Sequence, residues 1–368
     1  NAKKLGFGLM RLPLTDPNDG ASVDVELLKT MVDAFLEKGF TYFDTAWMYC
    51  GFQSEYAIRE ALVKLHPRDS YTLADKLHAG FLKTKEDRER IFQEQLRKTG
   101  VDYFDYYLLH DVGTDHYKTY QELDCFRWLE EKKAQGLARH VGFSFHDTAD
   151  VLDKILTEHP QMEFVQLQIN YVDWESDIIQ SRKCYEVCQE RGLPVVIMEP
   201  VRGGTLASLD KDAAAALQQA RPQDSVASWA IRFVASLPGV LTILSGMTTM
   251  DQLTDNLETL SDFQPLSGAD RETLGTALGI FRKNGIIPCT GCWYCMDCPV
   301  GVQIPDNFSR YNVYTVTKDE QAYRGSYAQL DPKARASACV GCGRCASRCP
   351  QQIDIPAKLK MIADMMGQ

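Results

Sequence analysis

Cysteines gather in two short runs near the C-terminal end of this 368-residue chain. The first run reads CTGCWYCMDCP over residues 289–299, and the second reads CVGCGRCASRCP over residues 339–350. Together they hold eight of the twelve cysteines. Cysteines three positions apart are too local for a nested set of disulfides, and disulfides are rare in the cytosol. The two runs therefore predict metal binding by closely spaced thiolates.

The spacing within the runs narrows the kind of metal site. The second run follows the pattern C-x2-C-x2-C-x3-C-P, which holds a 4Fe–4S cluster in bacterial ferredoxins, and the first run has its fourth cysteine one residue nearer. The alternative is a pair of structural zinc sites. Such a site uses two C-x2-C pairs and has no role for a third cysteine in the same run. The pattern favours iron–sulfur clusters.

The two runs and the segment between them resemble a two-cluster ferredoxin domain over residues 289–355. In such domains the fourth cysteine of each run binds the other cluster. The resemblance implies one cluster held by Cys289, Cys292, Cys295 and Cys349, and a second held by Cys339, Cys342, Cys345 and Cys298.

Short apolar runs alternate with amphipathic segments in the chain before the clusters. We expect eight strands, at residues 5–10, 40–43, 71–74, 104–109, 138–143, 164–168, 194–198 and 240–244. Clear helical patterns lie at residues 25–38, 55–64, 85–99 and 119–135. Glycines at 39, 100, 136 and 192 suit helix C-caps.

This order of elements predicts an α/β fold, a (β/α)8 TIM barrel over residues 1–265. A small α-helical, ferredoxin-like iron–sulfur domain follows over residues 266–368. The alternative is an open doubly wound sheet, which normally carries Gly-x-Gly-x-x-Gly after its first strand. The corresponding segment here, Gly6 to Arg11, lacks the third glycine.

Four ionisable side chains follow the carboxyl ends of predicted strands, where barrel enzymes place their chemistry. They are Asp44 and Tyr49 after the second strand, Lys76 after the third and His110 at the end of the fourth. The remaining histidines, apart from His146 near the mouth of the barrel, are expected in surface or core packing: His66, His78, His116, His140 and His159.

The segments around these residues resemble the aldo-keto reductase family, and most closely its branch with a C-terminal ferredoxin-like domain. The resemblance is carried by DTAWMY (44–49), LADK (73–76), DYYLLH (105–110), GFSFH (142–146), MEPVRGG (198–204) and LSGMTT (244–249). It implies an enzyme that moves a hydride between a nicotinamide, NADP or NAD, and a small carbonyl or alcohol substrate.

The resemblance also implies roles for the four side chains. Tyr49 would donate a proton to the substrate oxygen, although a free tyrosine has a pKa near 10. Lys76 would lower that pKa through its positive charge, Asp44 would hold the ammonium in place, and His110 would orient the carbonyl. The catalytic set is therefore Asp44, Tyr49, Lys76 and His110.

Cofactor contacts follow from the same resemblance. Ser144 and Gln166 would hold the nicotinamide amide, and the turn that opens the helix at Met250 would receive a phosphate. The full expected set is Gly8, Leu9, Met10, Ser144, Gln166, Ser245, Gly246, Met247, Thr248, Gln252 and Asn256. No basic side chain among them selects NADP over NAD. A flavin also remains open, since barrels can bind its phosphate without a dedicated motif.

Clusters that pass single electrons are unusual beside an enzyme that transfers a two-electron hydride, so the sequence leaves three functions open. The first is a carbonyl reductase or alcohol dehydrogenase whose clusters serve an electron-transfer partner, sense redox state or stabilise the fold. The second is a hidden-redox epimerase or lyase that retains its nicotinamide. The third is a non-catalytic electron carrier or regulatory subunit.

Composition limits the partners. A formal net charge of −10 argues against nucleic acid or an anionic membrane surface as the main partner. No apolar run approaches the roughly 20 residues that span a bilayer, and the first residues lack the apolar core of a signal peptide. We expect a cytoplasmic protein.

Overall fold

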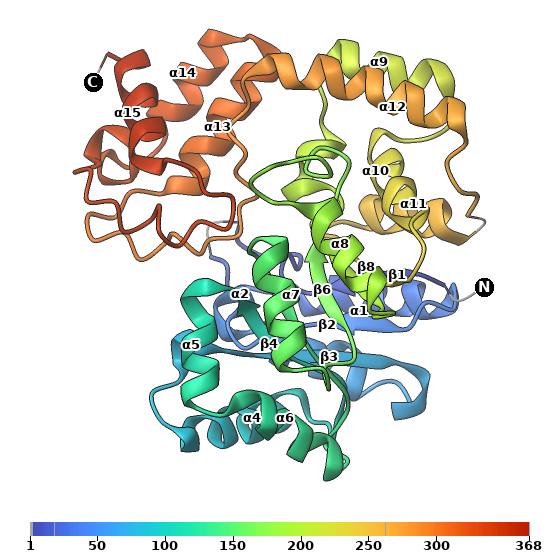
Figure 1. Cartoon of the computed structure of the whole chain (residues 1–368). Coiled ribbons are helices and arrows are strands. Elements are labelled where there is room, and N and C mark those ends of the chain that lie inside the picture. The colour runs from blue at the N-terminus through green and yellow to red at the C-terminus, as the bar shows by residue number, and fades with distance from the viewer. Residues whose placement is uncertain (1–2, 18, 262, 368) are drawn as a thin grey trace. The chain divides into compact units, whose positions relative to one another are not determined.

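Eight parallel strands form a closed barrel in the order β1 to β8 (Figure 1). The computed structural model describes residues 3–17, 19–261 and 263–367. The strands are β1 (Leu5–Gly8), β2 (Tyr42–Asp44), β3 (Thr72–His78), β4 (Phe104–Val112), β5 (Ala138–Phe145), β6 (Val165–Gln168), β7 (Val195–Met198) and β8 (Val240–Gly246). The eight predicted strands and the barrel are confirmed, and the open-sheet alternative is excluded.

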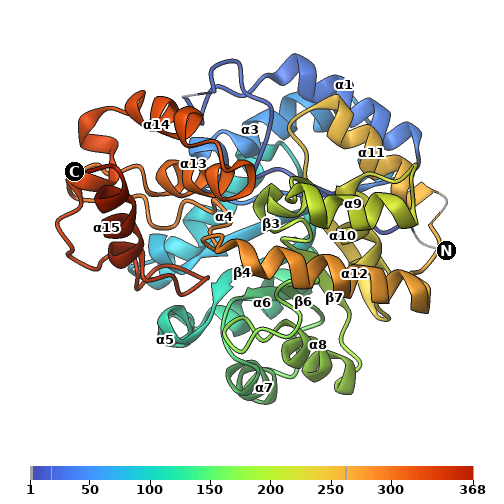
Figure 2. The same ribbon diagram turned by 90° about the horizontal axis from the view of Figure 1, so that it is seen from above.

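Helices follow the strands along the chain. They are α1 (Val25–Glu37), α2 (Tyr49–Phe52), α3 (Ser54–Ile58), α4 (Lys85–Thr99), α5 (Thr114–Glu122), α6 (Cys125–Ala134), α7 (Ala149–Glu158), α8 (Ser181–Glu190), α10 (Val226–Ala235) and α11 (Met250–Ser261). Neighbours such as α1 and α11 lie side by side outside the strands (Figure 2). This is the outer ring of a (β/α)8 barrel.

The helix ends predicted at glycine residues are confirmed. Gly100 ends α4 at a φ of 75° and donates its backbone N–H to the carbonyl of Leu96. The predicted stops at 39, 136 and 192 also have positive φ values. Glycine reaches this left-handed region without the steric cost that a side chain brings. Each helix can therefore end abruptly and turn into the next strand.

Two local predictions were wrong. Residues 119–135 do not form one helix, because Asp124 adopts a φ of 55° and separates α5 from α6. Asp44 and Lys76 lie within β2 and β3 and do not follow them, and His110 does not end β4, because these strands continue further than the apolar runs suggest. The extra length carries polar residues to the mouth of the barrel.

Side chains from β2, β3, β4, β7 and β8, with one from the residue before β6, fill one end of the barrel. Tyr42, Ala74, Leu108, Phe164, Val196 and Leu244 form this buried cluster. Gly142 on β5 lies so close to the neighbouring backbone that a Cβ atom there would be 2.3 Å from the carbonyl oxygen of Phe164. This end is a packed core, as is usual for the fold, and the chemistry is left to the opposite end.

The chain divides into two compact units, one of residues 1–200 and 231–265, the other of residues 201–230 and 266–368. The second unit contains α9 (Lys211–Ala220), α12 (Gly268–Phe281), α13 (Ile304–Thr317), α14 (Glu320–Ala328) and α15 (Ile355–Met365). Helices α9 and α12 lie against each other, and Arg221 after α9 pairs with Asp270 at the start of α12 at 2.7 Å. The domain boundary at residue 265 stays a prediction.

The second unit has an apolar core of its own. Its buried residues include Val302, Ile304, Phe308, Leu359 and Ile362, each no more than 1% exposed. Partly buried cysteines of both runs pack against this core. Within the described residues, no helix is both long and apolar enough to cross a bilayer.

Candidate active site and cluster ligands

An ion pair between Asp44 and Lys76 lies at the carboxyl ends of β2 and β3. Asp44 is 2% exposed and Lys76 is fully buried. The Lys76 ammonium donates hydrogen bonds to the Asp44 carboxylate and, at 2.7 Å, to the backbone carbonyl of Thr45. These two oxygen partners keep the buried ammonium charged and fix its position.

Tyr49 and His110 lie over this pair. The Lys76 ammonium is 5.0 Å from the centre of the Tyr49 ring, and the rings of Tyr49 and His110 meet edge to face at 5.8 Å. Tyr49 is 9% exposed and His110 2%. The structure thus brings the four predicted catalytic residues together at one end of the barrel.

Burial dominates the acid–base properties of the site. It raises the pKa of Tyr49 to about 12, although the charge and hydrogen bond of Lys76 act in the opposite direction. Lys76 thus lowers the pKa of Tyr49 as predicted, but burial, which the sequence did not reveal, outweighs it. Burial, with smaller contributions from His78 and Lys76, holds the pKa of His110 well below its usual range. At neutral pH Tyr49 keeps its proton and His110 is uncharged.

The charges of the ion pair follow the same physics. Burial lowers the pKa of Lys76, but the Asp44 carboxylate and Tyr49 outweigh it, and the net direction is upward. Burial raises the pKa of Asp44 against the pull of Lys76. The arrangement therefore stabilises the charged form of Lys76.

A second buried polar network lies beside the first and was not predicted. Lys98 on α4 pairs with Glu55 on α3, and both side chains are at most 4% exposed. Asp75 accepts hydrogen bonds at 2.8 Å from the backbone N–H of Lys76 and from the side chain of Gln95. These bonds fix the β3 backbone from which the Lys76 side chain projects.

Two predicted nicotinamide contacts are available at the mouth. The Gln166 side chain is 3% exposed, and its Oε1 atom is buried without a hydrogen-bond partner, which is costly unless a ligand donates to it. The Ser144 hydroxyl accepts from the backbone N–H of Asp111 at 2.8 Å and can still donate its own hydrogen. This arrangement fits a carboxamide, which has both donors and an acceptor.

The remaining predicted cofactor residues lie at the ends of β1 and β8, in the turns after them and on α11. Gly8 pairs with Gly246, and the β8 turn is fixed because Asn256 donates to Ser245 at 2.9 Å and Gln252 accepts from the backbone N–H of Thr248 at 2.7 Å. Thr248 and Gln252 are exposed, whereas Met247 is buried. Leu9 and Met10 follow β1, and Leu9 donates its N–H to the carbonyl of Asp44 at 2.9 Å. Their contact with a nucleotide stays a prediction.

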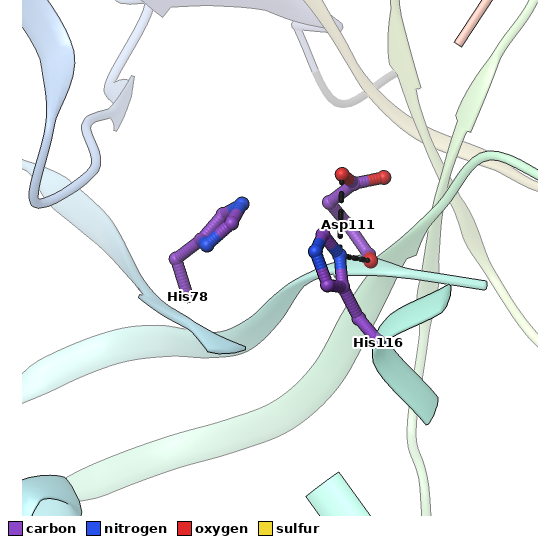
Figure 3. Close-up of side chains that lie close together, drawn as sticks. All are labelled: His78, Asp111 and His116. Carbon is purple, nitrogen blue, oxygen red and sulfur yellow. Dashed lines mark hydrogen bonds and ion pairs between the residues drawn. The ribbon is translucent and has the colours of Figure 1, made fainter. Parts of the chain in front are cut away.

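Two of the histidines assigned to ordinary packing instead gather near His110. His78 ends β3 and His116 lies on α5, and Figure 3 shows both beside Asp111 of β4. The His78 ring is 5.2 Å from that of His110. The only sequence signal was the position of His78 two residues after Lys76, on the same face of the strand.

The first cysteine run and Cys349 surround one cavity in the second unit. Its lining includes Cys289, Cys292, Cys295 and Cys349, together with apolar side chains such as Phe308. Burial raises the pKa of the Cys295 thiol, and the charges of the other three cysteines raise it further. The four thiols of the first predicted cluster therefore face a common space, with the fourth drawn from the other run.

In the second predicted set, too, a cysteine of one run lies beside the other run. Burial raises the pKa of Cys345, and Cys339 and Cys298 add to it, which places a thiol of the first run beside the second run. An ion pair between Arg348 and Asp297 also joins the runs.

Both runs offer backbone donors to sulfur. Gly291 donates its N–H to Cys289, and Gly341 donates to Cys339, each at 3.4 Å. N–H groups directed at cysteine sulfurs are typical of 4Fe–4S sites, where they stabilise the negative charge of the cluster. The donor set therefore fits two such clusters.

Comparison with known proteins agrees with this geometry. Residues 4–274 match the sequence profile described as Aldo/keto reductase family. The chain belongs to the aldo/keto reductase family. Residues 288–353 match the 4Fe-4S dicluster domain. The chain thus carries a dicluster domain after its aldo/keto reductase barrel, as the sequence motifs predicted.

Relatives in the family are distant. A probable aldo-keto reductase 1 of Glycine max is 29% identical over 55% of this chain and 56% of its own length. An aldo-keto reductase of Mycobacterium sp. (strain MCS) is 27% identical over 71% of this chain and 92% of its own. An NAD/NADP-dependent indole-3-acetaldehyde reductase of Schizosaccharomyces pombe is 27% identical over 46% of this chain and 57% of its own. The chain thus spans little more than half of two of these relatives.

Solved structures share the fold. The aldo-keto reductase of Klebsiella pneumoniae in complex with NADPH has a TM-score of 0.60 at 23% identity, covering 76% of this chain and 90% of that one. The holo form of a Bacillus halodurans aldo-keto reductase also has a TM-score of 0.60 at 23% identity, covering 74% and 91%. At this identity the likeness concerns the barrel alone.

Proposed function

We propose that the chain transfers a hydride between a nicotinamide cofactor and the carbonyl or alcohol group of a small molecule. The observation that carries the proposal is the buried Asp44–Lys76 pair, with Tyr49 and His110 above it at the carboxyl ends of the barrel strands. A proton donor, a fixed positive charge and a neutral imidazole are the groups needed to receive a developing alkoxide.

The side chains have distinct tasks in this proposal. A bound nicotinamide supplies the hydride in reduction and accepts it in oxidation. Tyr49 gives its proton to the carbonyl oxygen as the C–H bond forms, so the product is a neutral alcohol. Lys76 stabilises the phenolate left behind, and Asp44 holds Lys76. His110 donates a hydrogen bond to the same oxygen and orients it.

The direction follows from the acid–base state. With a pKa of about 12, Tyr49 holds its proton throughout the neutral range. A group that holds its proton is ready to act as an acid, whereas oxidation of an alcohol requires the rare deprotonated form. We therefore propose carbonyl reduction as the faster reaction at neutral pH.

The nicotinamide carboxamide is assigned to Gln166 and Ser144, supported by the buried Gln166 oxygen that lacks a partner. NADPH is the first cofactor to test because the Klebsiella pneumoniae structure contains it, and NADH the second because the Schizosaccharomyces pombe relative is described as using either. The cytoplasmic location also stays a prediction.

The test is an anaerobic turnover assay on the protein with both clusters, confirmed by about eight irons per chain. Loss of NADPH or NADH absorbance is followed with a panel of aldehydes and ketones. Tyr49→Phe should lower kcat by about 10²–10⁴-fold. Tyr106→Phe, on the same barrel but in the packed half of β4, should leave it unchanged. Equal activity of wild type and Tyr49→Phe would sink the proposal.

The same samples report on the clusters. A hydride delivers two electrons and a 4Fe–4S cluster accepts one, so we expect absorbance near 400 nm and the EPR spectrum to stay those of oxidised clusters during turnover. Reduced clusters would instead require a flavin or another group that splits the electron pair. A nicotinamide that stays bound through purification, without net aldehyde reduction, would favour a hidden-redox epimerase or lyase.

A further inference from the structure

Three side chains outside the predicted catalytic set converge at the mouth of the barrel. His78 ends β3, Asp111 lies in β4, and His116 comes from the first turn of α5. One ligand atom from each lies within 4.8 Å of the other two (Figure 3). Elements from successive βα units thus direct two imidazoles and a carboxylate at one point.

The local backbone builds this arrangement. The register of β4 against β5 shifts between Leu109 and Val112, and within that irregularity Asp111 adopts a φ of 57°. A non-glycine residue in this region needs compensating contacts. Asp111 has them, because its N–H donates to Ser144 and its carbonyl oxygen lies 2.9 Å from Nδ1 of His116.

Hydrogen bonds hold both imidazole rings. His78 accepts the backbone N–H of Gly80 at its Nδ1 atom, at 2.9 Å, so its neutral ring carries hydrogen on Nε2, and metal binding by His78 requires this bond to be released. The ring centres of His78 and His116 are 4.9 Å apart. The Asp111 carboxylate lies 3.4 Å from Nδ1 of His116. Nδ1 of His116 also lies 2.9 Å from the carbonyl oxygen of Asp111, and donation from Nδ1 leaves Nε2 of His116 unprotonated for a metal, as outer-shell contacts do in metal sites.

We propose that His78, Asp111 and His116 bind a divalent transition-metal ion at the mouth of the barrel. Two histidines and one carboxylate, with the remaining positions open, form a recurrent ligand set for zinc and ferrous iron. Metal–ligand bonds of about 2.0–2.2 Å require ligand atoms about 3–3.5 Å apart. Small side-chain rotations, with release of the Gly80 hydrogen bond to His78, therefore close the site.

The position of the site suggests its use. His78 is adjacent to His110, which orients the substrate carbonyl in the proposed function. A metal here would hold a second oxygen of the substrate while His110 and Tyr49 hold the first. This step rests on the proposed function, and it selects carbonyl compounds with a neighbouring hydroxyl or carboxylate, such as hydroxyaldehydes, keto acids and sugars.

Zinc binding is the primary test. Protein purified anaerobically with both clusters is dialysed against a chelator and then against graded zinc, and iron and zinc are counted together by mass spectrometry. Wild type should take up one zinc while its iron content stays constant. His116→Ala and His78→Gln should weaken this binding by more than the roughly 10–100-fold that loss of an outer-shell contact costs.

His66→Ala is the matched control. His66 also contacts an aspartate, Asp33, at 2.9 Å, but lies outside the one three-ligand group found among the described residues. It should bind zinc as wild type does. Wild type that takes up no zinc, or takes it up only as iron is lost, overturns the site, as does equal binding by His116→Ala and His66→Ala. The two histidine variants alter the ligand set independently, so a folding defect in one leaves the other decisive.

Substrate selection is tested separately. Glyceraldehyde carries a hydroxyl beside its carbonyl, and propanal does not. Zinc should lower the KM for glyceraldehyde and leave that for propanal unchanged, and equal effects on both would refute a second contact with the substrate. Zinc binding without reduction of either aldehyde would sink the proposed function and leave the metal site standing.

Discussion

Replacing Lys76 with methionine should destabilise the barrel and abolish proton transfer together. The methionine retains the length of the side chain but removes the ammonium, which leaves the Asp44 carboxylate buried at 2% exposure and the Thr45 carbonyl without its donor. Removing one partner of a buried pair costs about 3–5 kcal/mol. For a domain of this size, that corresponds to a thermal midpoint lowered by about 6–20 °C.

A double variant separates the effect of the unpaired charge on stability from the effect of the lost ammonium on catalysis. Asp44→Asn combined with Lys76→Met removes both charges, so most of the lost stability should return, to within about 1–3 kcal/mol of wild type for the unpaired polar groups that remain. Its activity should stay as low as that of Lys76→Met, about 10²–10⁴-fold below wild type, because the ammonium that supports Tyr49 is still missing.

Lys98→Met provides the matched control. Lys98 forms a buried pair with Glu55 in the same barrel, and its removal should cost a similar 3–5 kcal/mol. Assayed well below its midpoint it should retain kcat. The midpoints are measured anaerobically by far-ultraviolet circular dichroism, with cluster absorbance followed in parallel to report on the second unit.

A thermal midpoint of Lys76→Met equal to that of wild type would show that the pair contributes nothing to the stability of the native state. A double variant no more stable than Lys76→Met would show that the unpaired carboxylate is not the source of the lost stability. Loss of kcat in Lys98→Met to the same degree would mean that any weakened barrel loses activity.

Three further predictions concern the acid, the clusters and the packed end. Because the pKa of Tyr49 is raised to about 12, the rate of carbonyl reduction should be independent of pH between about 6 and 10, while the rate of alcohol oxidation should rise tenfold per pH unit. A fall in the reduction rate near pH 8–9 would show that the cofactor or substrate lowers this pKa. The double variant Cys298→Ser with Cys342→Ser changes two ligands of the same predicted cluster and should retain about four irons, whereas Cys298→Ser with Cys292→Ser changes one ligand of each cluster and should lose both. Equal iron content in the two double variants would contradict the assignment of Cys298 to the cluster of the second run. Gly142→Ala should lower the free energy of unfolding by about 1–3 kcal/mol, measured as a lower thermal midpoint, because its Cβ would lie 2.3 Å from a backbone oxygen. An unchanged midpoint would mean that the neighbouring backbone moves away without loss of stability.

The fold was predictable because its signals are local. Each barrel strand is a short apolar run bounded by turn residues, and glycines such as Gly39 and Gly100 mark helix ends wherever they occur. The cysteine runs are more specific still, since ligand type and spacing appear together. The error at Asp124 has the opposite origin, because nothing in its neighbours requires the positive φ that divides α5 from α6.

The site was only partly predictable because burial is a property of the whole fold. Sequence order brought Asp44, Lys76 and His110 to strand ends, but it could not show that desolvation would outweigh the Lys76 charge on Tyr49. The Lys98–Glu55 pair joins residues 43 positions apart, and the convergence of His78 with His116 depends on the irregularity in β4. Such contacts leave no local pattern.

Burial also explains why these four residues amount to more than a polar cluster. In water Tyr49 and Lys76 would titrate close together near pH 10, so the ammonium could give up its proton about as readily as the phenol. Inside the barrel, desolvation raises the pKa of Tyr49, whereas Asp44 keeps Lys76 charged against the same desolvation. The phenol therefore begins the reaction with its proton, and the ammonium becomes most favourable when that proton has left. An interaction that strengthens as charge develops lowers the barrier, whereas one equally strong in the ground state only tightens binding.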